Sequence, residues 1–373
     1  MKRTLFALSL LATTLLPAAA PAAAADPPHV LVVVSSEGRD GGRSRPGFEM
    51  DELAQAWLIF RDNGLQVTLA SPAGGPVEAD RFDPEAPWNA RLLALPEAAA
   101  ALAGTRATAD LVAADYDAVY VVGGKGAMFD LPRDAALARL IGAVHDAGGV
   151  VAAVCHGPAA LAEVRLADGS LLVAGRALTG FSNEEEAVFG KRWAPQFPWL
   201  LEDALRERGA RWQEAPLMMP KVVVDDRLVT GQNPYSTPAL AEAVVRALGR
   251  EPAPRTPWRE ERAMALVQRL LAGEAEAARA ELAADPAGHH AELIGLLGYY
   301  QLQAAQADAD VARARAIMEL ARPHMDEPRL DVGIAEAHWR LGETGRARTL
   351  LDAVLAAHPD LREAAELKAR LDE

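Results

Sequence analysis

Short runs of β-branched residues alternate with helical stretches through the first two thirds of this chain, and that order narrows the possible folds more than any other feature. The expected strands lie at 29–34, 65–70, 117–122 and 150–154 and on both sides of the Asp-Asp turn in 221–230. The expected helices lie at 51–63, 133–147 and 237–248. Strands that alternate with helices favour a mostly parallel sheet sandwiched by helices. We therefore expect an α/β domain over residues 26–249.

The chain changes character after a Pro-rich, charged linker at residues 250–257. From 258 to 373 it consists almost entirely of Ala, Leu, Arg and Glu at helical spacing, with Gly and Pro residues as breaks. The stretch from 335 to 359 is similar to a tetratricopeptide repeat, a unit of two helices that needs stacked neighbours to bury its apolar face. We expect an all-α helical-repeat domain, with a plain helical bundle as the alternative and no second catalytic centre.

The N-terminus is typical of a secretory signal peptide. Lys2 and Arg3 precede an apolar stretch at 5–16, and an Ala-rich segment follows as far as Ala25. The apolar stretch is shorter than the ~20 residues that a membrane-spanning helix needs. We therefore expect cleavage after Ala25 and a periplasmic or secreted mature protein.

The composition limits the partners of the mature protein. Half of the residues are hydrophobic, 24% are charged, and the formal net charge is −14. This is the profile of a soluble globular protein, and the negative charge argues against nucleic acid or an anionic membrane surface as a partner.

Cys155 is the only cysteine, and it stands where a strand ends. The β-branched run 150–154 leads directly into Cys155-His156-Gly157, and a small-residue helix is expected to begin at once. That order places a thiol on a sharp strand-to-helix turn, which is how many α/β proteins expose a nucleophile. The alternative is a buried thiol that packs as a small hydrophobe. A lone thiol in an exported protein cannot form an internal disulfide, which favours the chemical role.

A thiol with an ordinary pKa near ~8.5 is mostly protonated at neutral pH, so a nucleophilic cysteine needs help from its surroundings. The expected helix at Gly157 would direct its free N–H groups and the positive end of its dipole toward Cys155. His156 follows at once, and its backbone N–H is well placed to bind an oxyanion. An acid would complete the arrangement, but the residue pattern does not select one among 52 Asp and Glu residues.

Several stretches together resemble the ThiJ/PfpI superfamily of class I glutamine-amidotransferase-like proteins. They are 121–132, 153–158, 178–186 and 228–234. Two more, the helix around Glu52 and the segment 70–75, fit the branch that contains glyoxalase III enzymes and heat-shock chaperones. The resemblance runs from about residue 30 to 248 and implies a flavodoxin-like sheet sandwiched by helices.

The resemblance implies a role for each matching residue. Cys155 would be the nucleophile, and His156 would be the general base. Glu52 would be a buried acid that keeps its proton and donates it to the thiolate. Glu186 would orient His156, with Glu185 as the adjacent choice. Without the resemblance, we would interpret Glu52 as part of a solvated helix face. We would interpret the acidic run 184–186 as the start of a helix, where the helix dipole favours negative charge.

The resemblance also assigns the backbone N–H groups of Gly124 and His156 to an oxyanion hole. One position departs from the branch, because Lys125 stands where its members commonly carry histidine. A lysine can place positive charge beside an anionic intermediate or a carboxylate product, or it can simply face solvent. We name Lys125 as a candidate substrate contact.

The function that the resemblance implies is a glutathione-independent glyoxalase of the lactate-forming kind, a lyase. Cys155 would attack a 2-oxoaldehyde such as methylglyoxal to form a hemithioacetal, and His156 would move a proton between its two carbons through an enediol. We expect no cofactor: no metal cluster is evident in the residue pattern, and Gly123–Gly126 lacks the spacing of a phosphate-binding loop. The expected partners are a small carbonyl substrate and, by the resemblance, a second copy of the chain in a homodimer.

Two other functions stay open at this point. A cysteine amidase, peptidase or protein deglycase could use the same turn. Glutamine amidotransfer is disfavoured, because its histidine lies far downstream of the cysteine. A holdase chaperone or scaffold could use the C-terminal helices to bind a protein or peptide partner. Such a role would survive Cys155→Ala but not truncation at Pro254.

Overall fold

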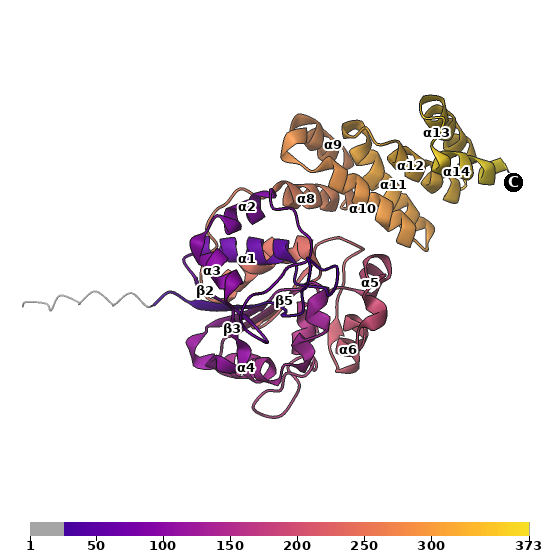
Figure 1. The fold of residues 1–373 in the computed structure, drawn as a ribbon. Coiled ribbons are helices and arrows are strands. Elements are labelled where there is room, and N and C mark those ends of the chain that lie inside the picture. Colours follow the sequence, from indigo (N-terminus) through magenta and orange to yellow (C-terminus); the bar gives the residue numbers. More distant parts are fainter. Residues whose placement is uncertain (1–25, 373) are drawn as a thin grey trace, which may run out of the picture.

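The computed structural model describes residues 26–372, and its N-terminal part is built around a seven-stranded sheet (Figure 1). Along the sheet the strands follow the order β3-β2-β1-β4-β5-β9-β8. All neighbouring strands are parallel except β9 and β8, which form a hairpin. The strands are β1 (His29–Val33), β2 (Gln66–Ser71), β3 (Arg106–Ala107), β4 (Ala118–Val121), β5 (Val150–Val154), β8 (Val222–Asp225) and β9 (Leu228–Gly231). The expected signal peptide, residues 1–25, lies outside the described residues.

Helices cover both faces of this sheet. α1 and α7 pack side by side on one face, and α4 lies on the opposite one (Figure 1). The helices of this part are α1 (Met50–Asp62), α2 (Pro87–Leu93), α3 (Pro96–Ala103), α4 (Ala135–Asp146), α5 (Asn183–Phe189), α6 (Leu201–Glu207) and α7 (Thr237–Ala247). β6 (Ala177–Leu178) and β7 (Arg211–Trp212) form a small separate sheet. The predicted α/β sandwich is confirmed.

The central strands are buried on both faces, as their continuous apolar sequences require. Every residue of β4 and β5 is buried, which is the pattern of parallel strands with helices on both sides. Because β1, β4 and β5 run in parallel, their carboxyl ends meet at one edge, after Val33, Val121 and Val154. Ligand sites of open α/β sheets lie outside such an edge. The loops at this edge are therefore the place to look for a functional site.

The C-terminal region is helical and begins after residues 250–258, which form neither helix nor strand. Its helices are α8 (Arg259–Leu271), α9 (Ala275–Ala284), α10 (Ala291–Ala304), α11 (Asp308–Ala321), α12 (Pro328–Arg340), α13 (Thr344–Ala357) and α14 (Arg362–Asp372). Helices adjacent in sequence pack together, α8 with α9, α10 with α11 and α12 with α13. No helix within residues 26–372 is both long and apolar enough to cross a membrane.

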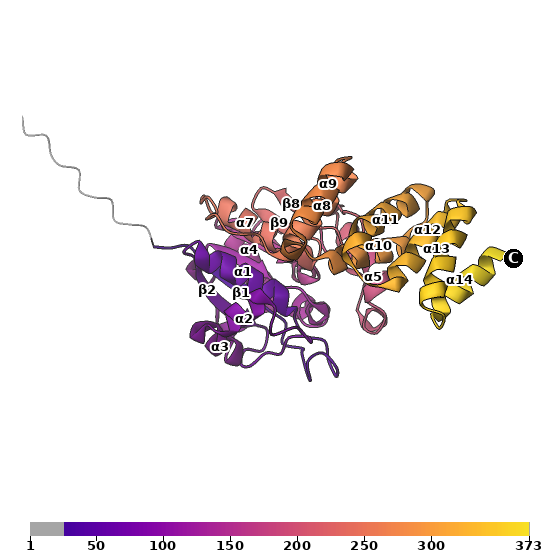
Figure 2. The ribbon, with the colours of Figure 1, turned by 90° about the horizontal axis from the view of Figure 1, so that it is seen from above.

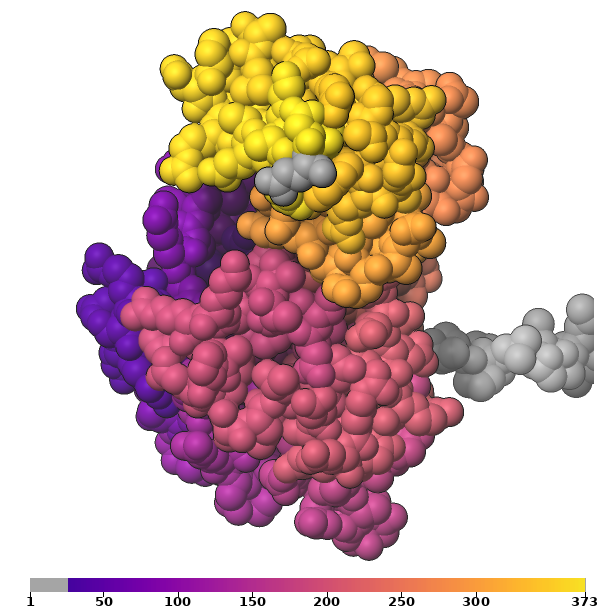
Figure 3. Space-filling view, turned by 90° about the vertical axis from the view of Figure 1, so that its right-hand side faces the viewer, coloured from indigo at the N-terminus to yellow at the C-terminus, as the bar shows by residue number. Residues whose placement is uncertain are grey.

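The helical region rests against the α/β domain (Figures 2 and 3). The contact is apolar: Leu217, Met218 and Met219 of the α/β domain belong to the same buried cluster as residues of α8, α10 and α11. Val188 and Phe189 of α5 pack against that cluster. A shared core therefore joins the two parts, in addition to the linker.

Candidate active site

Cys155 lies directly after β5 in a backbone conformation that residues with a side chain rarely adopt. Its φ is 58°, in the left-handed region, which is strained for a residue other than glycine. Two backbone hydrogen bonds hold the turn. Cys155 N–H donates to the Gly231 carbonyl at 2.9 Å, and Phe181 N–H donates to the Cys155 carbonyl at 2.8 Å. The structure therefore has the sharp turn that the sequence predicts, and Cys155 is 4% exposed within it.

A helix follows the turn from Gly157, as predicted, but it is a short 3₁₀ helix, Gly157–Leu161. Gly157 passes close to β4, since a Cβ at this position would lie 2.5 Å from the Val121 carbonyl oxygen. So short a helix aligns few peptide dipoles, so we expect its dipole to act on Cys155 less strongly than that of a longer α-helix would. Side chains and backbone N–H groups from other segments also surround the thiol.

His156 joins the thiol to a carboxylate on α5. Its Nε2 lies 2.8 Å from Oε2 of Glu186, and its Nδ1 lies 3.4 Å from Sγ of Cys155. A carboxylate only accepts hydrogen bonds, so in the neutral ring Nε2 carries the proton and Nδ1 keeps a lone pair. The thiol can then donate to Nδ1. The contact places Glu186, and not Glu185, beside His156.

The imidazole of His156 is neutral at neutral pH. Burial lowers its pKa, the hydrogen bond and the charge of Glu186 raise it, and the positive charge of Lys125 lowers it. The ring is 2% exposed and packs on Phe181, with 4.4 Å between the ring centroids. A neutral imidazole with a lone pair on Nδ1 is a base that can accept the thiol proton.

Glu52 reaches the thiol from α1 and is fully buried. Its Oε2 accepts a hydrogen bond from Gly123 N–H at 2.7 Å. Burial raises the pKa of Glu52 well above its usual value, and the negative charge of Glu49 adds to this effect. The hydrogen bond from Gly123 lowers the pKa in part. The carboxyl therefore keeps its proton at neutral pH. Its Oε1 has no hydrogen-bond partner among the described residues, so a proton there can be donated to the sulfur when the sulfur carries charge.

Burial also raises the pKa of the Cys155 thiol, and an ionised Glu52 beside it would raise it further. The backbone N–H of Gly124 donates toward the sulfur and lowers the pKa. Since Glu52 keeps its proton, burial is the dominant influence in the resting state. A thiol that is neutral at rest needs a base, and Nδ1 of His156 is placed to be that base.

Gly124 and His156 each have a backbone N–H near Cys155 that donates to no oxygen among the described residues, and the N–H of Gly124 points toward the sulfur. Gly124 has a φ of 90°, and a Cβ there would lie 2.6 Å from the backbone nitrogen of Glu49, so only glycine fits. These donors can bind an oxyanion that forms on a carbon attacked by the sulfur.

Lys125 opens a short 3₁₀ helix, Lys125–Met128, and is partly exposed. Its positive charge lowers the pKa of two carboxyl groups near the site. Burial raises the pKa of Asp80, whereas the hydrogen bond from Gly47 N–H and the charge of Lys125 lower it. Burial also raises the pKa of Glu49, to about 7, and Lys125 again acts in the opposite direction. No local pattern marks Glu49 or Asp80 as site residues, because both stand outside regular elements.

An aromatic wall borders His156. Besides Phe181, Phe197 lies 5.9 Å from the imidazole between ring centroids. Phe129 lies 5.4 Å from Phe197, and Trp193 lies 6.4 Å from Phe129. Phe129 lies far in the sequence from Phe181, Trp193 and Phe197, so the sequence pattern does not reveal the wall. It keeps water from the imidazole, which is the physical cause of the lowered pKa.

Glu185 contacts a different set of groups. With Ser182 it forms the capping box of α5. Its Oε1 accepts hydrogen bonds from Asn233 Nδ2 at 2.8 Å and from Met218 N–H at 3.2 Å. Burial raises the pKa of Glu185 to about 7, and its hydrogen bonds lower it in part. Glu185 therefore ties α5 to the segment around Met218.

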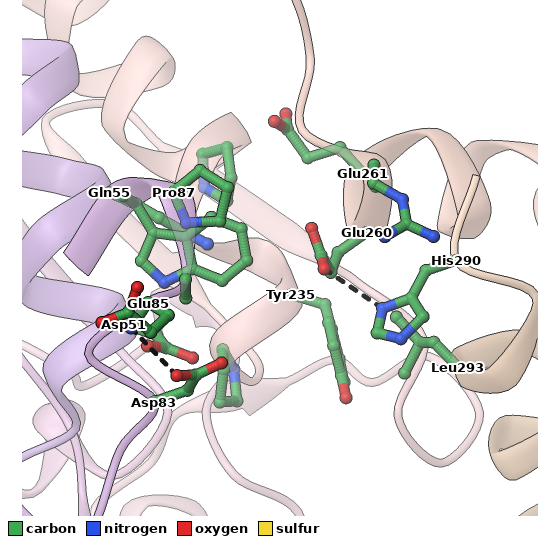
Figure 4. A pocket seen from close by; sticks show the side chains of 15 residues that line it. Asp51, Gln55, Asp83, Glu85, Pro87, Tyr235, Glu260, Glu261, His290 and Leu293 are labelled. Atoms are coloured by element: carbon green, nitrogen blue, oxygen red, sulfur yellow. Dashed lines mark hydrogen bonds and ion pairs between the residues drawn. The ribbon is translucent and has the colours of Figure 1, made fainter. Parts of the chain in front are cut away.

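A cavity of about 430 Å³ lies between the α/β domain and the helical region (Figure 4). Asp51 and Asp83 line one side, Glu260 and His290 line the other, and Tyr235 stands between them. His290 Nδ1 lies 3.1 Å from Glu260 Oε1. None of its described lining residues belongs to the group around the thiol. This acidic cavity and the enclosed thiol site are therefore separate.

The parallel sheet and the enclosed thiol, imidazole and carboxylate define the class: an α/β protein with a cysteine on a sharp turn after a strand. The model of the DJ-1/PfpI family matches residues 44–247, and the chain belongs to that family. A tetratricopeptide repeat model matches residues 328–371 in the helical region. Both predicted resemblances are confirmed.

The similar proteins include named glyoxalases. A glutathione-independent glyoxalase of Schizosaccharomyces pombe is 30% identical over 222 residues, which cover 54% of this chain and 86% of the relative. Glyoxalase 3 of Candida albicans is 31% identical over 216 residues, which cover 54% of this chain and 90% of the relative.

Solved structures agree with these relatives. The crystal structure of glyoxalase III from Candida albicans matches with a TM-score of 0.54 and 28% identity, and covers 59% of this chain and 97% of that one. The Rapid Encystment Protein 24 KDa of Francisella tularensis matches with a TM-score of 0.56 and 29% identity, over 59% of this chain and 99% of that one. The similarity to these proteins spans just over half of the chain.

Proposed function

We propose that this protein is a glutathione-independent glyoxalase that converts a 2-oxoaldehyde such as methylglyoxal to a 2-hydroxy acid. One observation carries the proposal: Nδ1 of a neutral imidazole, held by Glu186, lies 3.4 Å from the only thiol of the chain. Cys155 would itself supply the thiol that glutathione provides in other glyoxalases. The names of the Schizosaccharomyces pombe and Candida albicans relatives support this assignment.

In the first step, the Cys155 thiol gives its proton to Nδ1 of His156, and the sulfur adds to the aldehyde carbon. The aldehyde oxygen gains negative charge, which the backbone N–H groups of Gly124 and His156 stabilise. The imidazolium then returns the proton to this oxygen, and a neutral hemithioacetal results. Glu52 donates its proton toward the sulfur while the sulfur carries charge.

In the second step, neutral His156 removes the hydrogen of the former aldehyde carbon. The electron pair of that C–H bond forms a carbon–carbon double bond, and the ketone oxygen, now negatively charged, takes the proton of the hemithioacetal hydroxyl. The imidazolium then gives its proton to the neighbouring carbon, and the former aldehyde oxygen becomes the carbonyl oxygen of a thioester. Water that His156 deprotonates attacks the thioester, and the Cys155 thiol leaves. The sum is methylglyoxal plus water giving lactate, with no oxidant or reductant consumed.

The protonated state of Glu52 predicts opposite outcomes for two substitutions. Glu52→Gln is expected to keep most of the activity, because an amide can accept from Gly123 N–H and donate to the sulfur as the protonated carboxyl does. Glu52→Ala removes that donor and is expected to lower kcat/KM by about 10- to 100-fold, since a hydrogen bond to a charged group is worth ~1.5–3 kcal/mol. Steady-state kinetics measures both. Equal losses in the two variants would show that an ionised carboxylate is needed.

The lowered pKa of His156 predicts the acidic limb of the pH profile. A protonated imidazole cannot accept the thiol proton, so activity is lost only as the pH falls below the ordinary histidine value of 6.5. Lys125→Gln removes a charge that lowers this pKa, and is expected to move the limb to higher pH. The measurement is kcat/KM from about pH 5 to 8. A wild-type limb above 6.5, or a limb that moves down in Lys125→Gln, would contradict the assignment of the base.

A comparison of substrate classes tests the reaction itself. The protein is expected to consume methylglyoxal without glutathione and to leave simple amides and glycated peptides intact. Cys155-dependent consumption of an amide or an adduct, with 2-oxoaldehydes untouched, would replace the glyoxalase assignment by that of an amidase or deglycase.

Export after cleavage at Ala25, a homodimer and a peptide partner for the helical region stay predictions. Export would place the activity outside the cytoplasm.

A further inference from the structure

The helix that carries Glu186 is held from two sides, and one of them is the C-terminal helical region. α5 packs against α10, and the rings of Phe189 and Tyr300 meet edge to face with 5.0 Å between their centroids. Phe189 stands three residues after Glu186 on the same short helix. A displacement of α10 would therefore also displace the Glu186 carboxylate that contacts His156.

The segment 215–219 forms the second connection between the two parts. Leu217, Met218 and Met219 are buried in the cluster that the helical region builds. The side chain of Gln301 on α10 is 7% exposed, and its Nε2 donates to the Leu217 carbonyl at 2.9 Å. This buried polar contact fixes one register of the segment against α10.

The same segment is bonded directly to α5. Met218 has a φ of 64°, a conformation that a methionine keeps only when its surroundings impose it. In this conformation Met218 N–H donates to Oε1 of Glu185, and Asn233 Nδ2 donates both to Oε1 of Glu185 and to the Met219 carbonyl. A continuous set of buried contacts thus runs from Gln301 through Met218 and Glu185 to Glu186, the next residue.

We propose that the C-terminal helical region is a structural part of the active site, with Gln301 and Tyr300 as positioning residues for Glu186. The proposal rests on the proposed function only for the identity of the substrate. The 2.8 Å contact from Glu186 to His156 sets which imidazole nitrogen carries the proton, so a small displacement of α5 removes the base from the thiol. The helical region is then needed for turnover even if it binds no partner.

The test uses the full mature chain and two substitutions on α10. Gln301→Glu is nearly isosteric but replaces the donor to the Leu217 carbonyl by an acceptor. Tyr300→Leu removes the ring that meets Phe189 and keeps apolar bulk. Each is expected to lower kcat by about 10- to 100-fold with a smaller change in KM, because misplacement by about 1 Å can cost ~10²-fold in rate.

Alkylation of the single cysteine by iodoacetamide gives a readout that does not depend on the substrate. In the wild type the thiol is expected to react at a pH set by its contact with His156. In Gln301→Glu and Tyr300→Leu the midpoint of the alkylation profile is expected to move to higher pH, because the buried thiol loses its base. Circular dichroism spectra that match the wild type establish that each variant is folded.

Leu296→Ala is the matched control. Leu296 lies on α10 like Tyr300 and Gln301, but its side chain is 44% exposed. It is expected to change neither kcat nor the alkylation profile. A second control, Leu351→Ala, removes a fully buried side chain from a cluster that contains only residues of α12, α13 and α14. It is expected to lower stability and leave the alkylation midpoint in place.

The outcomes separate this inference from the proposed function. Folded Gln301→Glu and Tyr300→Leu with wild-type kcat and wild-type alkylation profiles would overturn the positioning role. A shift of the alkylation midpoint in both variants, with wild type that makes no lactate, would support the positioning role and remove the glyoxalase assignment. An equal shift of the alkylation midpoint in Leu351→Ala would show that general destabilisation causes the shift, and would also overturn the inference.

Discussion

Cys155→Ala is expected to reduce lactate formation from methylglyoxal by at least about 10³-fold, to the level of the uncatalysed reaction. The sulfur forms the covalent bond on which every later step depends, and the chain has no second cysteine to replace it. Loss of the nucleophile also leaves His156 with no thiol to deprotonate. Lactate measured over time in parallel samples of the variant and the wild type checks this result.

Folding of the variant needs its own control, since Cys155 has a φ of 58° and packs at the end of β5. Cys155→Ser keeps a side chain of similar shape and a weaker nucleophile, and it is expected to fold like the wild type and to be nearly inactive. If either folded variant kept more than a few per cent of the wild-type rate, another group would have to be the nucleophile.

Glu186→Gln is expected to lower kcat/KM by about 10²- to 10⁴-fold, although it changes the size of the side chain very little. The carboxylate accepts from Nε2 of His156 at 2.8 Å, which leaves the lone pair on Nδ1 toward the sulfur. An amide can donate to Nε2 instead, and the ring proton then moves to Nδ1, where it blocks proton transfer from the thiol. Loss of the base, and not of binding, predicts that kcat falls more than KM rises.

Glu184→Gln is the control for this substitution. Glu184 lies on the same helix as Glu186 but is exposed and has no contact with His156 among the described residues. It is expected to leave kcat/KM unchanged. A Glu186→Gln variant as active as Glu184→Gln would mean that His156 does not depend on its carboxylate neighbour for orientation.

The sheet and the turn at Cys155 could be predicted from the sequence because local sequence determines both. β4 and β5 are continuous apolar runs that must be buried on both faces, and the change from β-branched to small residues marks where β5 ends. The thiol and the adjacent imidazole follow from that turn. Glu52 and Glu186 do not, because each reaches the thiol site from a distant helix, and only the resemblance to the family singles them out.

The remaining features depend on contacts between segments far apart in the chain. Neighbouring positions on a helix point in different directions, so the choice between Glu185 and Glu186 depends on how α5 is placed against the sheet. The residues after Cys155 have the composition of a helix start, but that composition does not distinguish the short 3₁₀ helix that forms there from an α-helix. The contact of Gln301 with Leu217 joins residues 84 positions apart, and no local sequence pattern predicts it.

The most direct test of the glyoxalase assignment is the product of methylglyoxal, measured by ¹H nuclear magnetic resonance with the mature wild-type protein in glutathione-free deuterium oxide. The predicted result is lactate in an amount equal to the methylglyoxal consumed, with part of the C2 hydrogen replaced by deuterium, because the proton that His156 carries can exchange with solvent. Absence of lactate, with a thiol that still reacts readily with iodoacetamide, would contradict the assignment and leave only the nucleophilic turn.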